Sequence, residues 1–243
     1  MSHELSTIEE ALEDFKQGKI LVVIDDEDRE NEGDFICAAE LCTPETMNVM
    51  IKYGSGFVCA PTTAERLHEL NIPMMVEANS SRLGTAMTVT VDALQGTTTG
   101  VSAEDRATTV RKLADPAARG RDFTKPGHIV PLRAAPGGVL RRAGHTEASV
   151  DLCRLAGLQP MGVLAEVMND DGTMARTPQL FEIAKRFGYK VITIADLIAY
   201  RRKTERLIEL AATTKLPTKQ YGTVTVHAYE SEMWPQPAIA MVW

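Results

Sequence analysis

The chain of 243 residues is poor in several features that would assign it to a common class of protein. No apolar run approaches the ~18 residues of a membrane-spanning helix, so we predict no contact with a membrane. Acidic residues outnumber basic ones by 33 to 26, and this balance argues against nucleic acid as a partner. Cysteine is scarce, and its spacing fits no zinc-binding template. The four cysteines are Cys37, Cys42, Cys59 and Cys153.

The N-terminus, Met-Ser-His-Glu, lacks the basic and apolar regions of a signal peptide. We therefore expect a cytoplasmic protein whose thiols stay reduced. Aromatic residues make up only 5% of the chain, so its core must rely on aliphatic residues and methionine. The hydrophobic content of 44% is ordinary for a globular protein, and the length fits one large domain, or one domain with an appendage.

Carboxylates, by contrast, are concentrated in one short segment. Residues 25–34 carry six carboxylates before Asp34 adds the seventh, and they follow an apolar run, residues 20–24, that is typical of a buried strand. A strand that ends in such a loop brings oxygen ligands together, which is the chemistry that Mg²⁺ requires. Gly33 permits a sharp turn, so Glu30 and Asp34 could face one centre. The alternative is a solvated charged loop without function.

Strand-like and helix-like segments alternate along most of the chain. This order predicts an α/β (α+β) fold, a single three-layer-type domain over residues 1–205 with a mixed sheet and surrounding helices. Pro131 should mark a strand edge or end, and the last helix should run from about Ala195 to Leu210. The expected strands include residues 20–24, 35–39, 56–60, 85–91, 128–132, 161–168 and 189–194.

Three further groups could carry chemistry. Arg142 to Glu147 open a predicted helix, where free N–H groups, a guanidinium and a hydroxyl could bind a phosphate. His128 lies at the edge of a predicted strand, where it could be catalytic or only structural. Glu166 lies inside an apolar strand and could serve as a general acid or base, or could form a salt bridge.

Taken together, these segments resemble 3,4-dihydroxy-2-butanone 4-phosphate synthase, an enzyme family of riboflavin biosynthesis. Six matching segments follow the family's order and cover roughly residues 5–205. They are Asp25–Asp34, Gly54–Cys59, Thr88–Asp92, Thr99–Arg106, Pro126–His128 and Arg142–Ala148. The resemblance implies a homodimeric lyase that converts D-ribulose 5-phosphate to 3,4-dihydroxy-2-butanone 4-phosphate and formate, using Mg²⁺ or Mn²⁺, with two ions per active site.

The resemblance also implies a role for each matching residue. Glu30 and His145 would bind the metal, and His128, Glu166 and Asp34 would be catalytic. The residues expected to contact the substrate are Arg29, Glu30, Asp34, Arg142, Ala143, Gly144, His145, Thr146 and Glu166.

The segment after residue 205 has a different pattern, with two expected strands at residues 222–229 and 238–243. It resembles the junction in bifunctional proteins that fuse the synthase to a GTP cyclohydrolase II domain. We interpret residues 206–243 as the end of a linker helix and a truncated segment of that kind, a short β-type remnant, and expect no GTP cyclohydrolase II activity. Two other functions remain open: a metal-dependent sugar-phosphate isomerase using the same pocket, and a catalytically silent scaffold protein.

Overall fold

The computed structural model describes residues 5–231 and 234–243, which form two compact units. The first unit ends at Leu197 and the second begins at Ile198. Residues 1–4, on which the prediction about a signal peptide rests, lie outside the described residues. Within the described part of the chain, no helix is both long enough and apolar enough to cross a membrane.

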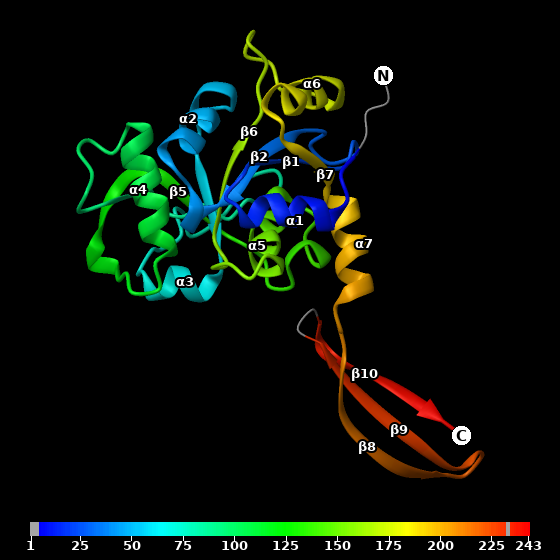
Figure 1. The fold of residues 1–243 in the computed structure, drawn as a ribbon. Coiled ribbons are helices and arrows are strands. Elements are labelled where there is room, and N and C mark those ends of the chain that lie inside the picture. The colour runs from blue at the N-terminus through cyan, green and yellow to red at the C-terminus, as the bar shows by residue number, and fades with distance from the viewer. Residues whose placement is uncertain (1–4, 232–233) are drawn as a thin grey trace. The chain divides into compact units, whose positions relative to one another are not determined.

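The first unit is built around a seven-stranded sheet with helices on both faces (Figure 1). The strand order is β4-β5-β3-β6-β2-β1-β7, and the predicted mixed sheet is confirmed because β1–β7 and β3–β5 are parallel while the other pairs are antiparallel. The strands are β1 (Leu21–Ile24), β2 (Gly33–Ala38), β3 (Cys59–Thr62), β4 (Val91–Ala93), β5 (Phe123–Arg133), β6 (Gly162–Glu166) and β7 (Lys190–Thr193). The helices are α1 (Ile8–Lys16), α2 (Pro44–Tyr53), α3 (Ala64–Glu69), α4 (Ala103–Ala114), α5 (His145–Leu155) and α6 (Thr177–Phe187), with short 3₁₀ helices η1 (Ala39–Leu41), η2 (Gly120–Asp122) and η3 (Gly138–Leu140). Helix α7 (Ile194–Thr204) contains the boundary between the two units.

The two faces of the sheet pack against different helices. Phe35 and Cys37 of β2 pack in one apolar cluster with Met47 of α2 and Leu180 of α6. Because successive side chains of a strand point to opposite faces, Asp34 lies on the other face of β2. Helices α1 and α5 contact each other and β2 there. The fold thus presents a carboxylate of β2 to the N-terminal end of α5.

The segment before β4 differs from its prediction. We expected a period-two strand over residues 85–91, but the strand begins only at Val91, and Thr88 makes an isolated bridge instead. Pro131 supplies the physical reason: its carbonyl accepts the Thr88 N–H at 3.1 Å, but it has no N–H to return. The prediction that Pro131 marks a strand edge or end is wrong, because β5 continues to Arg133 and lies between β4 and β3.

The second unit is a three-stranded antiparallel sheet rather than two strands. Its order is β10-β9-β8, formed by β8 (Glu209–Thr218), β9 (Gly222–Ser231) and β10 (Trp234–Val242). The last helix ends at Thr204, so the prediction that it continues to Leu210 is wrong. Pro217 lies inside β8, which is an edge strand, where a residue without an N–H is tolerated.

The close approach of α6 to β2 depends on Gly33. A Cβ at this position would lie 2.5 Å from Cδ1 and 2.8 Å from Cδ2 of the fully buried Leu180. We therefore expect Gly33→Ala to lower the free energy of unfolding by about 1–3 kcal/mol, measured by chemical denaturation. The same substitution should cost clearly less in a Leu180→Ala background, and an equal cost in both backgrounds would contradict this packing.

Candidate functional site

The acidic loop between β1 and β2 is folded around one buried carboxylate, that of Asp25. Its two oxygens accept the backbone N–H groups of Glu30, at 3.1 Å, and Glu32, at 2.9 Å. Nη1 of Arg29 donates to Asp25 Oδ2 at 2.8 Å and to Glu30 Oε2 at 2.6 Å. Asp25 therefore fixes the loop, and Arg29 is held between two carboxylates.

His145, the first residue of α5, contacts this loop although it is distant from it in the sequence. Its Nε2 lies 3.0 Å from the Val23 carbonyl, to which it donates because a carbonyl can only accept. Its Nδ1 lies 3.4 Å from Glu30 Oε2 and 3.7 Å from Asp34 Oδ1. The predicted neighbourhood of Glu30, Asp34 and His145 is thus present in the structure.

Three of these side chains are close enough to bind one metal ion. Asp25, Glu30 and His145 each offer a ligand atom, and these atoms lie within 4.8 Å of one another. Next to them, Oδ1 of the buried Asp34 has no hydrogen-bond partner in the described part of the chain. Carboxylate oxygens and an imidazole suit Mg²⁺ or Mn²⁺, and an unpartnered buried carboxylate oxygen needs a proton or a cation.

Glu166 joins the same group from the neighbouring strand. It ends β6, where it is half-buried, and it lies directly opposite Asp34 in the antiparallel pairing of β2 with β6. Residues directly opposite in such a pair share one face of the sheet, so Glu166 also faces α5. It therefore lies at the end of its apolar strand, rather than within it as expected.

Burial and neighbouring charges shift the pKa values of this group in opposite directions. The hydrogen bond with His145, together with Arg29, lowers the pKa of Glu30 to about 2. Burial, reinforced by Glu166 and Glu30, raises the pKa of Asp34 to about 7. Burial alone would lower the pKa of His145, but Asp34 and Glu30 raise it to about 9. Near neutral pH, the protein without metal thus holds protons at the place where a cation would bind.

Metal binding should therefore release protons and strengthen with pH. As a ligand, His145 would bind through its neutral ring, but its pKa of about 9 keeps the ring protonated below that pH. Between pH 7 and pH 9 we expect the affinity for Mn²⁺ to rise by up to about tenfold per pH unit, measured by calorimetric titration in buffers of different protonation enthalpy. Glu30 adds no pH dependence in this range because its pKa is about 2. A constant affinity over this range would exclude His145 as a ligand.

The start of α5 also carries the predicted anion-binding residues. Gly144 is the N-cap and gives the helix no side-chain cap, so the first N–H groups of α5 are free of such a partner. A Cβ at this position would collide with the guanidinium of Arg142 and lie 2.9 Å from Nη2 of Arg29. Thr146 is buried, whereas Ala143 is exposed and has no side-chain polar group to offer. The two guanidiniums thus converge at Gly144.

His128 does not join this group directly. Nδ1 of its partly exposed ring lies 2.7 Å from Oδ2 of Asp92, and its backbone N–H donates to the other oxygen of Asp92 at 2.8 Å. His128 is on β5, and β3 lies between β5 and the strand of Glu166. About two strand spacings of 4.8 Å therefore separate the two strands. Asp92 thus holds the imidazole through Nδ1, and Nε2 is the ring nitrogen that Asp92 does not engage.

Reasoning from the sequence missed Asp92 as a partner of His128 and Asp25 as a possible ligand. The role of Asp92 could not be predicted because Asp92 resembles any polar residue after an apolar strand. Its partner, His128, is 36 residues away in the sequence. Asp25 is one of several carboxylates in the acidic run, and its contacts with Arg29 and two N–H groups are visible only in the folded loop. Cys59 is buried, and burial together with Glu166 and Asp34 raises the pKa of its thiol.

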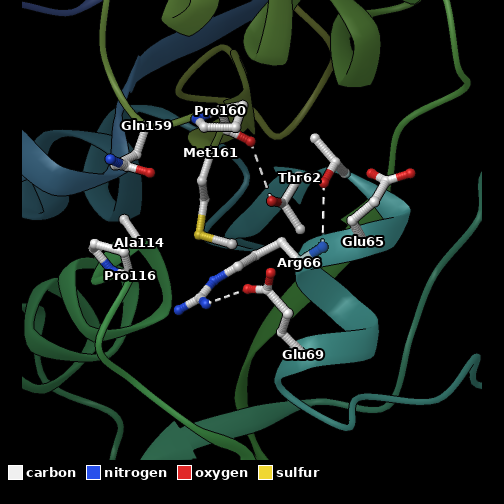
Figure 2. Close-up of a pocket in the computed structure, with 10 residues that line it drawn as sticks. Thr62, Glu65, Arg66, Glu69, Ala114, Pro116, Gln159, Pro160 and Met161 are labelled. Carbon is white, nitrogen blue, oxygen red and sulfur yellow. Dashed lines mark hydrogen bonds and ion pairs between the residues drawn. The ribbon is translucent and has the colours of Figure 1, made fainter.

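A separate cavity of about 220 Å³ lies between the start of α3, the end of α4 and residues 159–161 (Figure 2). Its main cation, Arg66, is fully engaged by Glu69 at 2.7 Å and by the carbonyls of Leu113 and Asp115. Thr62 donates to the carbonyl of Pro160 at 3.1 Å. These contacts tie α3 to the end of α4, and the end of β3 to residues 159–161.

Comparison with known proteins gives a consistent result. Residues 9–200 match the family model of 3,4-dihydroxy-2-butanone 4-phosphate synthase. The riboflavin biosynthesis protein RibBA of Parabacteroides distasonis is 60% identical over 220 residues, which are 90% of this chain and 54% of that protein. RibBA of Aquifex aeolicus is 52% identical over 240 residues, 98% of this chain and 59% of that protein. The chain thus spans about half the length of the curated relatives that it matches.

Solved structures agree. RibBX of A. baumannii, a two-domain 3,4-dihydroxy-2-butanone 4-phosphate synthase, superposes with a TM-score of 0.89 at 43% identity, covering 98% of this chain and 70% of that one. A 3,4-dihydroxy-2-butanone 4-phosphate synthase in complex with two magnesium ions superposes with a TM-score of 0.81 at 46% identity, covering 82% of this chain and 98% of that one.

Proposed function

Because the chain belongs to the 3,4-dihydroxy-2-butanone 4-phosphate synthase family, we propose that it converts D-ribulose 5-phosphate to 3,4-dihydroxy-2-butanone 4-phosphate and formate. This is a lyase reaction in riboflavin biosynthesis. The main support in the structure is the group of Glu30, Asp34, His145 and Glu166, which three separate segments of the chain bring to one face of the sheet.

In this proposal, Glu30 and His145 bind Mg²⁺ or Mn²⁺, with Asp25 as a further candidate ligand. The donor set fits either ion, and two ions per site are proposed because a structural relative is in complex with two magnesium ions. A bound cation would polarise the ketone and its neighbouring hydroxyls, which lowers the cost of forming an enediolate.

The side chains around the cation have complementary tasks in the proposal. Arg29 contacts the sugar, and Arg142 to Thr146 at the start of α5 contact the substrate and its phosphate. Asp34, whose pKa of about 7 lets it hold or accept a proton near neutral pH, is a candidate general base. Glu166 lies opposite it as a second proton carrier. His128, oriented by Asp92, lies apart from this group on β5 and is proposed as a third.

A formate assay tests the proposal directly. Purified protein with D-ribulose 5-phosphate and Mg²⁺ should release formate, and EDTA should stop the release until excess Mg²⁺ is added. Formation of an isomeric pentulose phosphate without formate would favour the isomerase. Absence of both products would favour the scaffold protein, and either result would refute the lyase.

The remaining expectations belong to the same proposal. We propose a cytoplasmic homodimer, with a synthase domain over residues 1–205 and a segment over residues 206–243 that resembles the start of a GTP cyclohydrolase II domain. The family match at residues 9–200 supports the first boundary. Size-exclusion chromatography coupled to light scattering measures the oligomeric state.

A further inference from the structure

A cavity of about 360 Å³ opens at the N-terminal end of α5, next to the carboxylate group. Its polar lining comes from Arg133 at the end of β5, Arg142 before α5, and Thr146 and Glu147 in its first turn. Thr146 directly follows His145, whose ring contacts Glu30. Consecutive residues of one helix turn thus serve the carboxylate group and the cavity.

The charges that line the cavity are unequally compensated. Nη1 of Arg142 lies 2.6 Å from Oε2 of Glu147, whose side chain is only 1% exposed. Nη2 of Arg142 donates to the Leu83 carbonyl at 3.2 Å. Arg133 is exposed, and within the described part of the chain its guanidinium takes part in no hydrogen bond or ion pair. The uncompensated positive charge of the cavity therefore belongs to Arg133.

A second observation points to an anion. Thr146 lines the cavity and is only 6% exposed, yet within the described residues its hydroxyl has no hydrogen-bond partner. The helix that it opens has eleven residues, and its N-cap is Gly144, which supplies no capping side chain. A hydroxyl and free N–H groups at the positive end of a helix dipole are suited to phosphate oxygens.

We propose that Arg133 is a specificity-determining residue that binds the phosphate group of the substrate, together with Thr146 and the first N–H groups of α5. This assignment rests on the proposed function, which supplies a phosphate monoester as the ligand. A phosphate dianion needs more positive charge than the Arg142–Glu147 pair can offer, because Glu147 already neutralises Arg142. Arg133 provides that charge at the phosphate. The carboxylate group can then contact the other end of the sugar.

The test compares Arg133→Gln with a matched control, Arg154→Gln, which removes an exposed Arg near the opposite end of α5. For Arg133→Gln we expect KM for D-ribulose 5-phosphate to rise about 10- to 100-fold, with kcat changed by no more than about threefold. Arg133→Lys should restore part of the loss. Arg154→Gln should behave as the wild type, and all variants should keep their melting temperature.

Calorimetric titration with inorganic phosphate separates this inference from the proposed function, because it needs no turnover. The wild type and Arg154→Gln should bind phosphate, and Arg133→Gln should bind it at least about tenfold more weakly. If the wild type releases no formate, the proposed function fails, while the titration still decides the role of Arg133. Unchanged phosphate affinity in Arg133→Gln, or no phosphate binding by the wild type, would overturn the inference.

Discussion

Replacing His145 with Ala is expected to abolish nearly all turnover, because the change removes a proposed metal ligand. The ring supplies the nitrogen that lies 3.4 Å from Glu30 Oε2, and without it the remaining ligands come only from the acidic loop. Mutating a residue that only supports a metal ligand already lowers metal affinity by about 10–100-fold. We therefore expect the loss of the ligand itself to lower the affinity for Mn²⁺ by at least about 100-fold. Titration with Mn²⁺ and the formate assay measure the two effects.

The buried position of His145 requires controls for folding. The ring also donates to the Val23 carbonyl, so the alanine variant loses a hydrogen bond inside the protein. His145→Gln keeps a polar side chain and should lose metal binding while folding normally. His68→Ala, at an exposed histidine of α3, should change neither affinity nor turnover. Wild-type Mn²⁺ affinity in a folded His145 variant would remove this residue from the metal site.

Glu166→Gln is expected to lower kcat by about 10²–10⁴-fold, the range that a positioned acid or base contributes. Amide and carboxylate have nearly the same shape, but the amide cannot exchange a proton. Within the described residues, the Glu166 side chain forms no hydrogen bond or ion pair, so the fold should not depend on it. We therefore expect an unchanged melting temperature together with the loss of formate release.

Glu182→Gln provides the matched control for that experiment, because Glu182 is exposed on α6 and its loss changes the net charge equally. It should retain full activity. A Glu166→Gln variant with wild-type kcat would show that Asp34 and His128 carry the proton transfers without it. Thermal unfolding of each variant distinguishes lost chemistry from lost structure.

Much of this site could be predicted from the sequence, because two of its parts are each formed by one short segment of the chain. The acidic loop is visible as a run of carboxylates after an apolar strand, and the N-terminus of α5 is visible from Gly144 and the polar residues that follow it. The mixed sheet followed from the alternation of strands and helices. The two site signals each lie within about ten residues of the chain, and the alternation is built from similarly short patterns.

Relations between distant segments could not be predicted. The pairing of Asp34 with Glu166 depends on the register of β2 against β6, and the contact of His128 with Asp92 depends on β4 lying beside β5. The charge balance around Arg133 depends on Glu147 having neutralised Arg142. Such facts follow only from the folded chain, because no local pattern encodes them.

The most direct test of the account is to locate the metal by anomalous scattering from crystals grown with Mn²⁺. The account predicts an anomalous peak within coordination distance of Glu30 and His145, about 2.0–2.3 Å from their ligand atoms, next to Asp34. A manganese ion bound elsewhere, with no peak between the acidic loop and α5, would contradict the claim that the fold assembles its catalyst there.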